Sequence, residues 1–243
     1  MAVRIAMWSG PRNISTALMR SWGSRPDCHV TDEPLYAYYL LATGLDHPGR
    51  EATLARHETD WRRVVAWLTG PVPDGKTIWY QKHMAHHLLP DVGRDWLDEL
   101  THAFLIRDPR EMLLSLAEFL PDIRVEDTGL PQQVELFRRR RARGDEPAVV
   151  DSRDVLLAPE PTLRALCARL GVPFDRAMLR WEPGLRETDG AWSPYWYAKV
   201  EQTTTFGRYE PKQEPLPDRL RPVYDACLPL YEELAQAKIR PDV

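Results

Sequence analysis

The stretch MWSGPRNISTALMRSW, residues 7–22, decides how this chain is expected to fold. The apolar residues 3–8 predict a buried strand, and the Ser-Gly-Pro that follows breaks any regular element. Over residues 14–23, large apolar side chains recur every four positions, which is the spacing of one face of a helix. A strand, a tight turn and a helix therefore open the chain.

The turn between this strand and this helix has the chemistry of an anion site. The first N–H groups of a helix have no partner within the helix, and the helix dipole is positive at that end. Arg12 adds a cation that can form two parallel hydrogen bonds, and Ser15 and Thr16 add hydroxyl donors. Phosphate or sulfate fits such a site, although an ordinary helix start with a surface arginine would show the same residues. The lysine of the nucleotide-triphosphatase loop, G-x-x-x-x-G-K-[ST], is missing.

A second motif, FLIRDPREMLLSLAEF over residues 104–119, predicts another strand followed by a helix. Asp108 is a good N-cap and Glu111 comes three positions later, which is the pattern of a capping box. Arg107 stands at the carboxyl end of the expected strand, where open α/β sheets bind their ligands. Ser115 follows two helical turns in, about 9 Å along the axis. Because helix-start chemistry does not explain Arg107, we expect Arg107 and Ser115 to hold one phosphate together.

The order of the elements predicts an α/β fold. Short apolar segments alternate with helical patterns, which indicates a parallel sheet covered by helices on both faces. We therefore expect a three-layer α/β/α architecture around a central, mostly parallel sheet. The expected strands are residues 3–8, 28–31, 76–81, 103–106 and 148–150. The expected helices are residues 14–23, 34–43, 51–68, a short one ending at 96–100, 109–120, 132–143, 161–170 and 217–237, and residues 181–213 are expected to be irregular.

Composition excludes several classes of protein. The chain has 243 residues with 43% hydrophobic and 28% charged residues, which is ordinary for a soluble globular protein. A formal net charge of −4 provides no basic field for nucleic acid. There is no apolar run of about 18 residues and no signal-peptide core, so we expect no membrane span. Three cysteines, far apart in the chain, fit neither a disulfide framework nor a zinc site, which favours a cytoplasmic location.

Together the two motifs resemble those of the sulfotransferases that use 3′-phosphoadenosine 5′-phosphosulfate (PAPS). The resemblance rests on Gly-Pro-Arg before a hydroxyl-rich helix start and on R-D-P-R-E-x-x-x-S. The family loop is commonly P-[KR]-S-G-T-T, and here Asn-Ile replaces the Ser-Gly pair. The resemblance implies that the first loop binds the 5′-phosphosulfate and that the second motif binds the 3′-phosphate. The residues carried over are Arg12, Asn13, Ser15 and Thr16 for the 5′-phosphosulfate, and Arg107 and Ser115 for the 3′-phosphate.

The same resemblance implies a function. Residues 1–243 would form one sulfotransferase-like domain with a P-loop-like architecture. That domain would transfer a sulfuryl group from PAPS, as co-substrate and without a metal, to a hydroxyl or amine. The acceptor would be a small molecule or a carbohydrate.

Two residues are candidates for the general base that takes the acceptor's proton. Glu33 follows the second expected strand, which we expect to neighbour the first, so that Glu33 lies at the same end of the sheet. Its position resembles that of the glutamate base in tyrosylprotein and carbohydrate sulfotransferases. His83, with Lys82 before it, resembles the K-T-H of cytosolic sulfotransferases, where the histidine is the base and the lysine contacts the bridging oxygen. We favour Glu33 as the base.

Other interpretations of the same residues stay open. In H-M-A-H-H, residues His83, His86 and His87 stand close together, but the Glu of the zinc motif H-E-x-x-H is missing, so we expect no metal. An atypical nucleotide or small-molecule kinase is a second class of enzyme. The missing Gly-Lys and the lack of a clear Asp for Mg²⁺ argue against it. A nucleotide-binding module without activity is the third interpretation, because the first loop departs from the family pattern.

Overall fold

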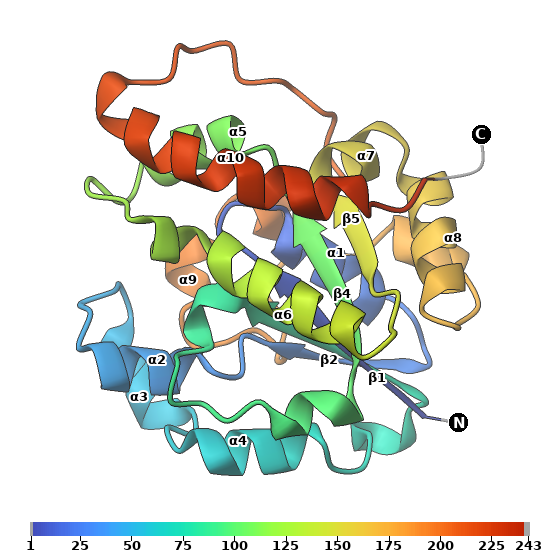
Figure 1. The fold of residues 1–243 in the computed structure, drawn as a ribbon. Coiled ribbons are helices and arrows are strands. Elements are labelled where there is room, and N and C mark those ends of the chain that lie inside the picture. The colour runs from blue at the N-terminus through green and yellow to red at the C-terminus, as the bar shows by residue number, and fades with distance from the viewer. Residues whose placement is uncertain (1, 241–243) are drawn as a thin grey trace.

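Five parallel strands form the centre of the computed structural model, which describes residues 2–240 (Figure 1). Their order across the sheet is β2-β3-β1-β4-β5. Because all five run in the same direction, their carboxyl ends meet at one edge of the sheet. The strands are β1 (Val3–Ser9), β2 (Cys28–Asp32), β3 (Ile78–Met84), β4 (Thr101–Ile106) and β5 (Ala148–Asp151).

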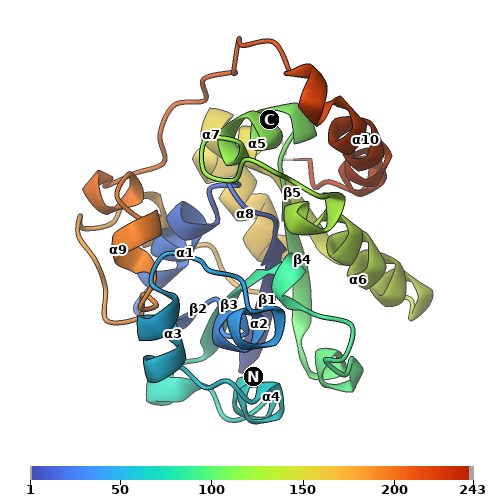
Figure 2. The ribbon, with the colours of Figure 1, turned by 90° about the vertical axis from the view of Figure 1, so that its left-hand side faces the viewer.

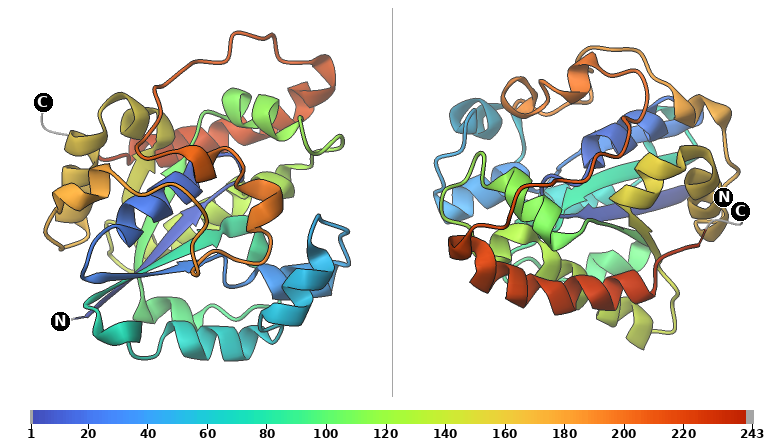
Figure 3. Two further views of the ribbon diagram at one scale, coloured as in Figure 1. Left: turned by 180° about the vertical axis from the view of Figure 1, so that it is seen from behind. Right: turned by 90° about the horizontal axis from the view of Figure 1, so that it is seen from above.

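Helices cover both faces of this sheet. Figure 3 shows α6 and α10 on one side of the sheet and α1 on the other. The first face packs against α4 (Trp61–Leu68), α5 (Pro109–Leu116), α6 (Leu130–Ala142) and α10 (Arg221–Gln236). The second face packs against α1 (Ser15–Gly23), α7 (Ser152–Leu157) and α8 (Pro159–Arg169). A third group of helices, in which α9 lies beside α3 in Figure 2, comprises α2 (Tyr36–Thr43), α3 (Arg50–Arg56) and α9 (Ser193–Trp196).

The expected three-layer α/β/α architecture is confirmed, and its core follows the alternation of side chains along each strand. Trp8 and Phe104 point to the face covered by α6, while Met7 and Leu105 point to the face covered by α1. None of the helices among the described residues is long and apolar enough to cross a bilayer. Short 3₁₀ turns complete the connections at Pro73–Gly75, Ala85–His87, Asp95–Glu99, Val125–Thr128, Arg176–Leu179, Val200–Gln202 and Asp218–Leu220.

Several helices begin or end elsewhere than expected. The helix expected over residues 51–68 is two helices, because the chain leaves helical geometry at His57 and restarts where Asp60 Oδ1 accepts from Arg62 N at 2.9 Å. The helix expected over residues 109–120 is α5, which ends at Leu116. Helix α7 was not expected, although Asp151 caps it by accepting from Arg153 N at 2.8 Å. At Asp60 and at Asp151 a short polar cap outweighs the longer apolar pattern.

The third strand differs from expectation in a way that matters for the site. It runs from Ile78 to Met84 instead of over residues 76–81, so Lys82 and His83 lie inside the strand. The expectation that the strand before Glu33 neighbours the first strand is wrong, because β3 lies between β2 and β1. Glu33 therefore lies beside the carboxyl end of β3.

Candidate functional site

The loop between β1 and α1 has a backbone conformation that its residues do not favour. Arg12 and Ile14 have φ angles of 61° and 50°, in the left-handed region where a β-branched residue is rare. Such conformations persist where the surroundings impose them, and they are concentrated at ligand sites. Gly10 lies where the loop meets the start of α6, and a Cβ on it would stand 2.2 Å from Thr128 O. The close approach of Thr128 therefore fixes the path of the loop.

Two helices begin at the carboxyl ends of central strands and are capped differently. At the start of α5, Asp108 Oδ1 accepts from Arg110 N at 2.9 Å and from Glu111 N at 3.2 Å. At the start of α1, no side chain of residues 2–240 caps the helix and no acidic residue stands in its first turn. The first N–H groups of α1, around the buried Ser15 and the half-buried Thr16, are available to an anion.

The structure brings three of the expected phosphate ligands together. Arg12 Nε donates to Ser115 Oγ at 3.0 Å. Arg107 Nη1 donates to the backbone oxygen of Arg12 at 2.6 Å. The Arg12 guanidinium also lies over the ring of Phe119, 4.6 Å from its centroid. The first loop and the second motif therefore form one cationic surface.

The expected capping box at the start of α5 is only half formed, because Glu111 has other partners. Its Oε2 accepts from Arg107 Nη2 at 3.2 Å, and its Oε1 accepts from Tyr209 OH at 2.5 Å. Glu111 thereby holds Arg107 at the end of β4. A pocket of about 160 Å³ opens beside it. Its charged lining residues are four cations, Arg107, Arg110, Arg153 and Lys212, and three carboxylates, Asp108, Glu111 and Asp151.

Asn13 points away from the surface of the loop. Its Nδ2 donates to Leu105 O on β4 at 2.9 Å, and the residue is 3% exposed. Its Oδ1 is buried and has no hydrogen-bond partner in the described part of the chain. The side chain thus anchors the loop to the sheet, so a contribution of Asn13 to anion binding would come from its backbone.

A second cluster lies at the carboxyl ends of β2 and β3. Lys82 Nζ donates to Asp32 Oδ1 at 2.8 Å and to Glu33 Oε1 at 2.5 Å. Asp32 and Lys82 stand opposite each other in the register of the two strands. Glu33 has a φ of 38°, and its N–H donates to Lys82 O at 2.9 Å. This turn folds the Glu33 carboxyl over the end of β3, so Glu33 and Lys82 are brought together.

Tyr197, far along the sequence, completes this cluster. Its OH donates to Asp32 Oδ2 at 2.6 Å and accepts from Lys82 Nζ at 2.8 Å. Trp192 Nε1 lies 3.3 Å from the same hydroxyl, and Gly190 N donates to Asp32 Oδ2 at 3.2 Å. These five polar groups thus meet in a region closed to solvent, since Lys82, Tyr197 and Asp32 are all buried.

Burial and neighbouring charges together set the pKa values of the ionisable groups in this cluster. Although burial lowers it, the pKa of Lys82 is raised well above its ordinary value by Asp32 and Glu33, so the ammonium is charged. Burial raises the pKa of the Glu33 carboxyl, Lys82 opposes this shift and Asp32 adds to it. Burial, together with Asp32, raises the pKa of the Tyr197 phenol well above its ordinary value. A carboxyl with a raised pKa beside a fixed cation suits a general base.

His83 lies on the opposite face of the sheet from Lys82, because successive side chains of a strand alternate. Its ring stacks on Trp8 with the centroids 4.4 Å apart, and its Nε2 lies 3.3 Å from Gln81 Oε1. Burial lowers the pKa of His83 to about 3, and His102 adds to the shift. The structure therefore brings Glu33 to Lys82 and leaves His83 in the core.

His86 and His87, in the turn after β3, pack against aromatic side chains of α2. The His87 ring stacks on both Tyr36 and Tyr39, with centroids 4.7 Å apart in each pair. Burial lowers the pKa of His86 to about 4 and that of His87 well below its ordinary value, so both rings are neutral. Within residues 2–240, no group of three or more His, Cys, Asp or Glu side chains is arranged as a metal site.

A family model matches almost the whole chain, over residues 3–238, and its description is "sulfotransferase domain". This chain belongs to the sulfotransferase domain family. A relative in Arabidopsis thaliana, branched-chain-amino-acid aminotransferase-like protein 2, is 35% identical over 230 residues. The match covers 95% of this chain and 41% of that protein, so the sulfotransferase domain spans less than half of the relative's length.

Solved structures show the same fold. A sulfotransferase from Alicyclobacillus acidocaldarius has a TM-score of 0.55 and 13% identity, covering 100% of this chain and 98% of that chain. A sulfotransferase domain from the curacin biosynthetic pathway has a TM-score of 0.52 and 12% identity, covering 93% of this chain and 97% of that chain. At these identities the similarity shows the fold alone.

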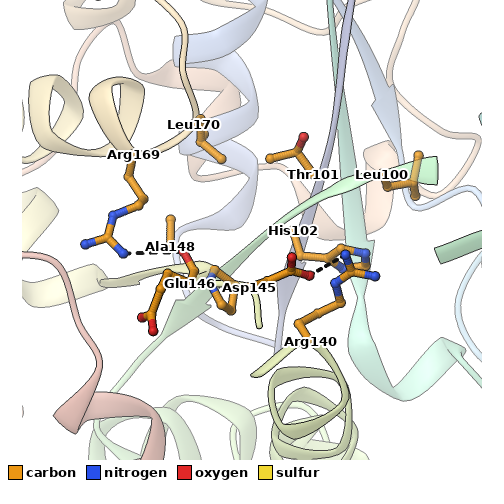
Figure 4. Close-up of a pocket in the computed structure, with 10 residues that line it drawn as sticks. Leu100, Thr101, His102, Arg140, Asp145, Glu146, Ala148, Arg169 and Leu170 are labelled. Atoms are coloured by element: carbon orange, nitrogen blue, oxygen red, sulfur yellow. Dashed lines mark hydrogen bonds and ion pairs between the residues drawn. The ribbon is translucent and has the colours of Figure 1, made fainter. Parts of the chain in front are cut away.

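The sulfotransferase domain has another, larger pocket at the amino ends of β4 and β5, the edge opposite to the loop between β1 and α1. Its volume is about 260 Å³, and Figure 4 shows His102, Arg140 and Arg169 among its lining residues. Arg140 is paired with Asp98, at 2.8 Å, and with Asp145. Arg169 Nη1 donates to Glu146 O at 3.3 Å. Arg140 is thus ion-paired within the protein, and Arg169 bonds to a backbone oxygen.

The sequence analysis missed some residues of the candidate site. It did not select Asp32, although a T-D-E run at a strand end is a signal for clustered carboxylates. Tyr197 and Tyr209 gave no signal, because they lie in the stretch that was expected to be irregular. Only the fold shows that these two hydroxyls reach Asp32 and Glu111.

Proposed function

We propose that this domain transfers a sulfuryl group from PAPS to a hydroxyl or amine of a small-molecule or carbohydrate acceptor. The observation that carries the proposal is the meeting of Arg12, Arg107 and Ser115 beside the start of α1. Arginine and hydroxyl donors around a helix start suit phosphate and sulfate groups. Membership of the sulfotransferase domain family supports the same chemistry.

The donor would bind across the first loop and the start of α5. The N–H groups of the first turn of α1, with Arg12, Ser15 and Thr16, would hold the 5′-phosphosulfate. Arg107 and Ser115 would hold the 3′-phosphate, beside a pocket whose lining has one more cationic side chain than carboxylates. Donor binding would then replace the hydrogen bond between Arg12 and Ser115 by bonds from both residues to the nucleotide.

The reacting groups are drawn from the second cluster. Glu33 would accept the proton of the acceptor's O–H or N–H as the oxygen or nitrogen forms its bond to sulfur. The bond between sulfur and the bridging oxygen then breaks, and the electron pair stays on the 5′-phosphate. Lys82 and Arg12 would neutralise the charge that develops on these oxygens. The buried ammonium of Lys82, 2.5 Å from Glu33 Oε1, supports this division of roles.

Ligand-induced stabilisation tests the donor. A ligand that binds only the folded state stabilises it by about 2.7 kcal/mol when present at 100 times its Kd. Adenosine 3′,5′-bisphosphate should raise the melting temperature, whereas adenosine 5′-phosphate should do so less at equal concentration. Stabilisation by ATP with Mg²⁺ and not by the bisphosphate would contradict the proposal and favour a kinase.

The transfer itself is tested by screening acceptors with PAPS that carries a labelled sulfuryl group. Label should appear in a hydroxyl- or amine-bearing acceptor, and the Glu33→Gln variant should serve as the control that binds donor without turnover. Tight binding of the bisphosphate with no transfer across phenols, alcohols, amines and sugars would favour a nucleotide-binding module instead.

A further inference from the structure

Lys82 is shared by two carboxylates that have very different surroundings. Asp32 is fully engaged, because its Oδ1 accepts from Lys82 Nζ while its Oδ2 accepts from Tyr197 OH and Gly190 N. Glu33 is bonded through Oε1 alone, and its Oε2 lies 3.9 Å from His87 Nδ1, beyond hydrogen-bond distance. The Glu33 side chain is also 12% exposed, whereas that of Asp32 is 1% exposed. Both oxygens of Asp32 are therefore held by hydrogen bonds, whereas Glu33 keeps Oε2 to accept a proton from a reacting group.

We propose that Asp32 and Tyr197 are positioning residues for the transfer reaction. Asp32 takes one of the three hydrogen bonds that Lys82 donates and offsets its charge, so that Glu33 keeps its capacity to accept a proton, and Tyr197 holds Asp32 in place. The proposal rests on the proposed function, in which Glu33 takes the proton of the acceptor.

The charges around Glu33 explain why the second carboxylate matters. If Lys82 faced Glu33 alone, its positive charge would stabilise the Glu33 carboxylate and make it a weak base. Asp32 offsets that charge from the neighbouring strand, while His87 is neutral because burial lowers its pKa well below its ordinary value. The titratable groups that face Glu33 come from five parts of the chain: Asp32 of β2, Lys82 of β3, Tyr36 of α2, His87 of the turn after β3, and Tyr197 of the C-terminal part.

Tyr197 also ties a distant segment to the end of the sheet. Gly190, Trp192 and Tyr197 all belong to one stretch, and two of them bond directly to Asp32. The Trp192 ring stands edge-on to Tyr36 with centroids 4.9 Å apart, which fixes the segment against α2. Asp32 is therefore the point at which this segment and the Lys82–Glu33 pair are joined.

Titration of Glu33 by carboxyl carbon NMR tests the role of Asp32, with the resonance assigned by its loss in Glu33→Gln. In the unaltered protein the pKa of Glu33 should lie above the ordinary value of about 4.3. Asp32→Asn keeps the shape and removes the charge, so the pKa of Glu33 should fall by about one unit or more. An unchanged or higher value in Asp32→Asn would overturn the proposal. So would a value at or below 4.3 in the unaltered protein, which tests the idea even where the variant fails to fold.

Tyr197→Phe separates the two positioning roles. It leaves Asp32 charged, so it should move the pKa of Glu33 less than Asp32→Asn does. It also removes a donor to Asp32, so the Gly190 amide should exchange its hydrogen about tenfold faster or more. Tyr38→Phe is the matched control, since Tyr38 is a buried tyrosine that donates to Asp91 outside this cluster. Exchange at Gly190 as slow as in the control would contradict the role given to Tyr197.

Neither measurement needs a nucleotide or an acceptor, so a failure of this proposal and a failure of the proposed function can be told apart. If adenosine 3′,5′-bisphosphate does not bind but Asp32→Asn lowers the pKa of Glu33, the proposed function fails and the positioning arrangement stands. With an acceptor in hand, Asp32→Asn should lower kcat and leave the KM for PAPS unchanged. The acid limb of the pH profile should move to lower pH, which a loss of structure would not produce.

Discussion

The hydrogen bond from Arg12 Nε to Ser115 Oγ, 3.0 Å long, joins the loop after β1 to the second turn of α5 across 103 residues of sequence. The backbone oxygen of Arg12 also accepts from Arg107, so the two motifs are connected twice. In the proposed function Arg12 and Ser115 contact different phosphate groups of one nucleotide. Donor binding in the proposed function replaces this bond, so the contributions of Arg12 and Ser115 to affinity should be coupled.

A double-mutant cycle measures this coupling. Arg12→Ala and Ser115→Ala should each weaken binding of adenosine 3′,5′-bisphosphate. The double variant should lose more than the sum of the two, because each single variant already removes the bond that the ligand would otherwise have to break. Contacting residues show interaction energies of about 0.5–3 kcal/mol in such cycles. Calorimetric titration of the four proteins gives the value. Losses that add to within about 0.3 kcal/mol would mean that the two side chains act independently.

Arg107→Ala should discriminate between nucleotides. Arg107 is held at the end of β4 by Glu111, and the proposal places it on the 3′-phosphate. A hydrogen bond to a charged group contributes about 1.5–3 kcal/mol, so affinity for adenosine 3′,5′-bisphosphate should fall at least tenfold. Affinity for adenosine 5′-phosphate should change little. Arg138→Ala, which removes only an exposed ion pair with Glu233, is the control and should leave both affinities unchanged. An equal loss of affinity for both nucleotides in Arg107→Ala would show that Arg107 does not bind the 3′-phosphate.

Gly10→Ala tests the fixed path of the loop between β1 and α1. The added Cβ would stand 2.2 Å from the backbone oxygen of Thr128, so the loop or the start of α6 must move. Nucleotide affinity should fall by about tenfold or more, because ligand geometry is lost when a loop shifts by about 1 Å. Gly23→Ala is the matched control, since the nearest atom to its Cβ is a Val30 methyl at 3.5 Å. Normal affinity in Gly10→Ala would show that the loop tolerates movement.

The parallel sheet and the position of Arg107 could be predicted because local patterns encode them. A short apolar run that ends in Arg-Asp-Pro marks both the end of β4 and the N-cap of α5, and the structure has both. The helix expected over residues 51–68 could not be divided from the apolar pattern alone, because the break depends on one cap at Asp60.

The arrangement around Glu33 could be predicted only in part. Glu33 and Lys82 were each chosen from a strand end, yet their contact depends on the strand order, and β3 was not expected between β2 and β1. His83 looked equivalent to Lys82, because the expected strand ended before both. The observed strand continues through Met84, so alternation sends the two side chains to opposite faces. Tyr197 could not be predicted, since no local pattern indicates that this distant side chain reaches Asp32.

Glu33→Gln and His83→Asn should act on different properties of the protein. Gln keeps the shape of Glu33 and removes its basicity, so turnover should fall by about 10²–10⁴-fold while nucleotide binding is retained. His83 stacks on Trp8 in the core, so His83→Asn should lower the free energy of unfolding by about 1–3 kcal/mol and affect turnover less. Turnover rates and denaturant unfolding, measured on both variants, separate the effect on catalysis from the effect on stability. A folded Glu33→Gln enzyme with near-normal turnover, beside an inactive but stable His83→Asn, would transfer the role of base to His83.

Buried histidines should make the stability of the fold depend on pH. Burial lowers the pKa of His83 to about 3 and those of His86 and His102 to about 4. In the unfolded chain these rings take up protons near pH 6.5, whereas in the folded state they do not until pH 4 or below. Between these values the unfolded state binds more protons, so the free energy of unfolding falls as pH falls, by up to about 1.4 kcal/mol per pH unit for each histidine.

Two carboxyl groups change the free energy of unfolding in the opposite direction over part of this pH range. Burial raises the pKa values of Glu33 and Asp151, so the folded state takes up protons there before the unfolded state does. Because the buried histidines outnumber these carboxyls, the histidine effect should dominate between pH 6.5 and pH 5. Urea unfolding at half-unit steps of pH should therefore show stability falling over this interval. His102→Gln, which keeps an oxygen that can accept from Trp8 Nε1, should make the dependence shallower. Stability that is constant or rises as pH falls from 6.5 to 5 would show that these rings become protonated in the folded protein.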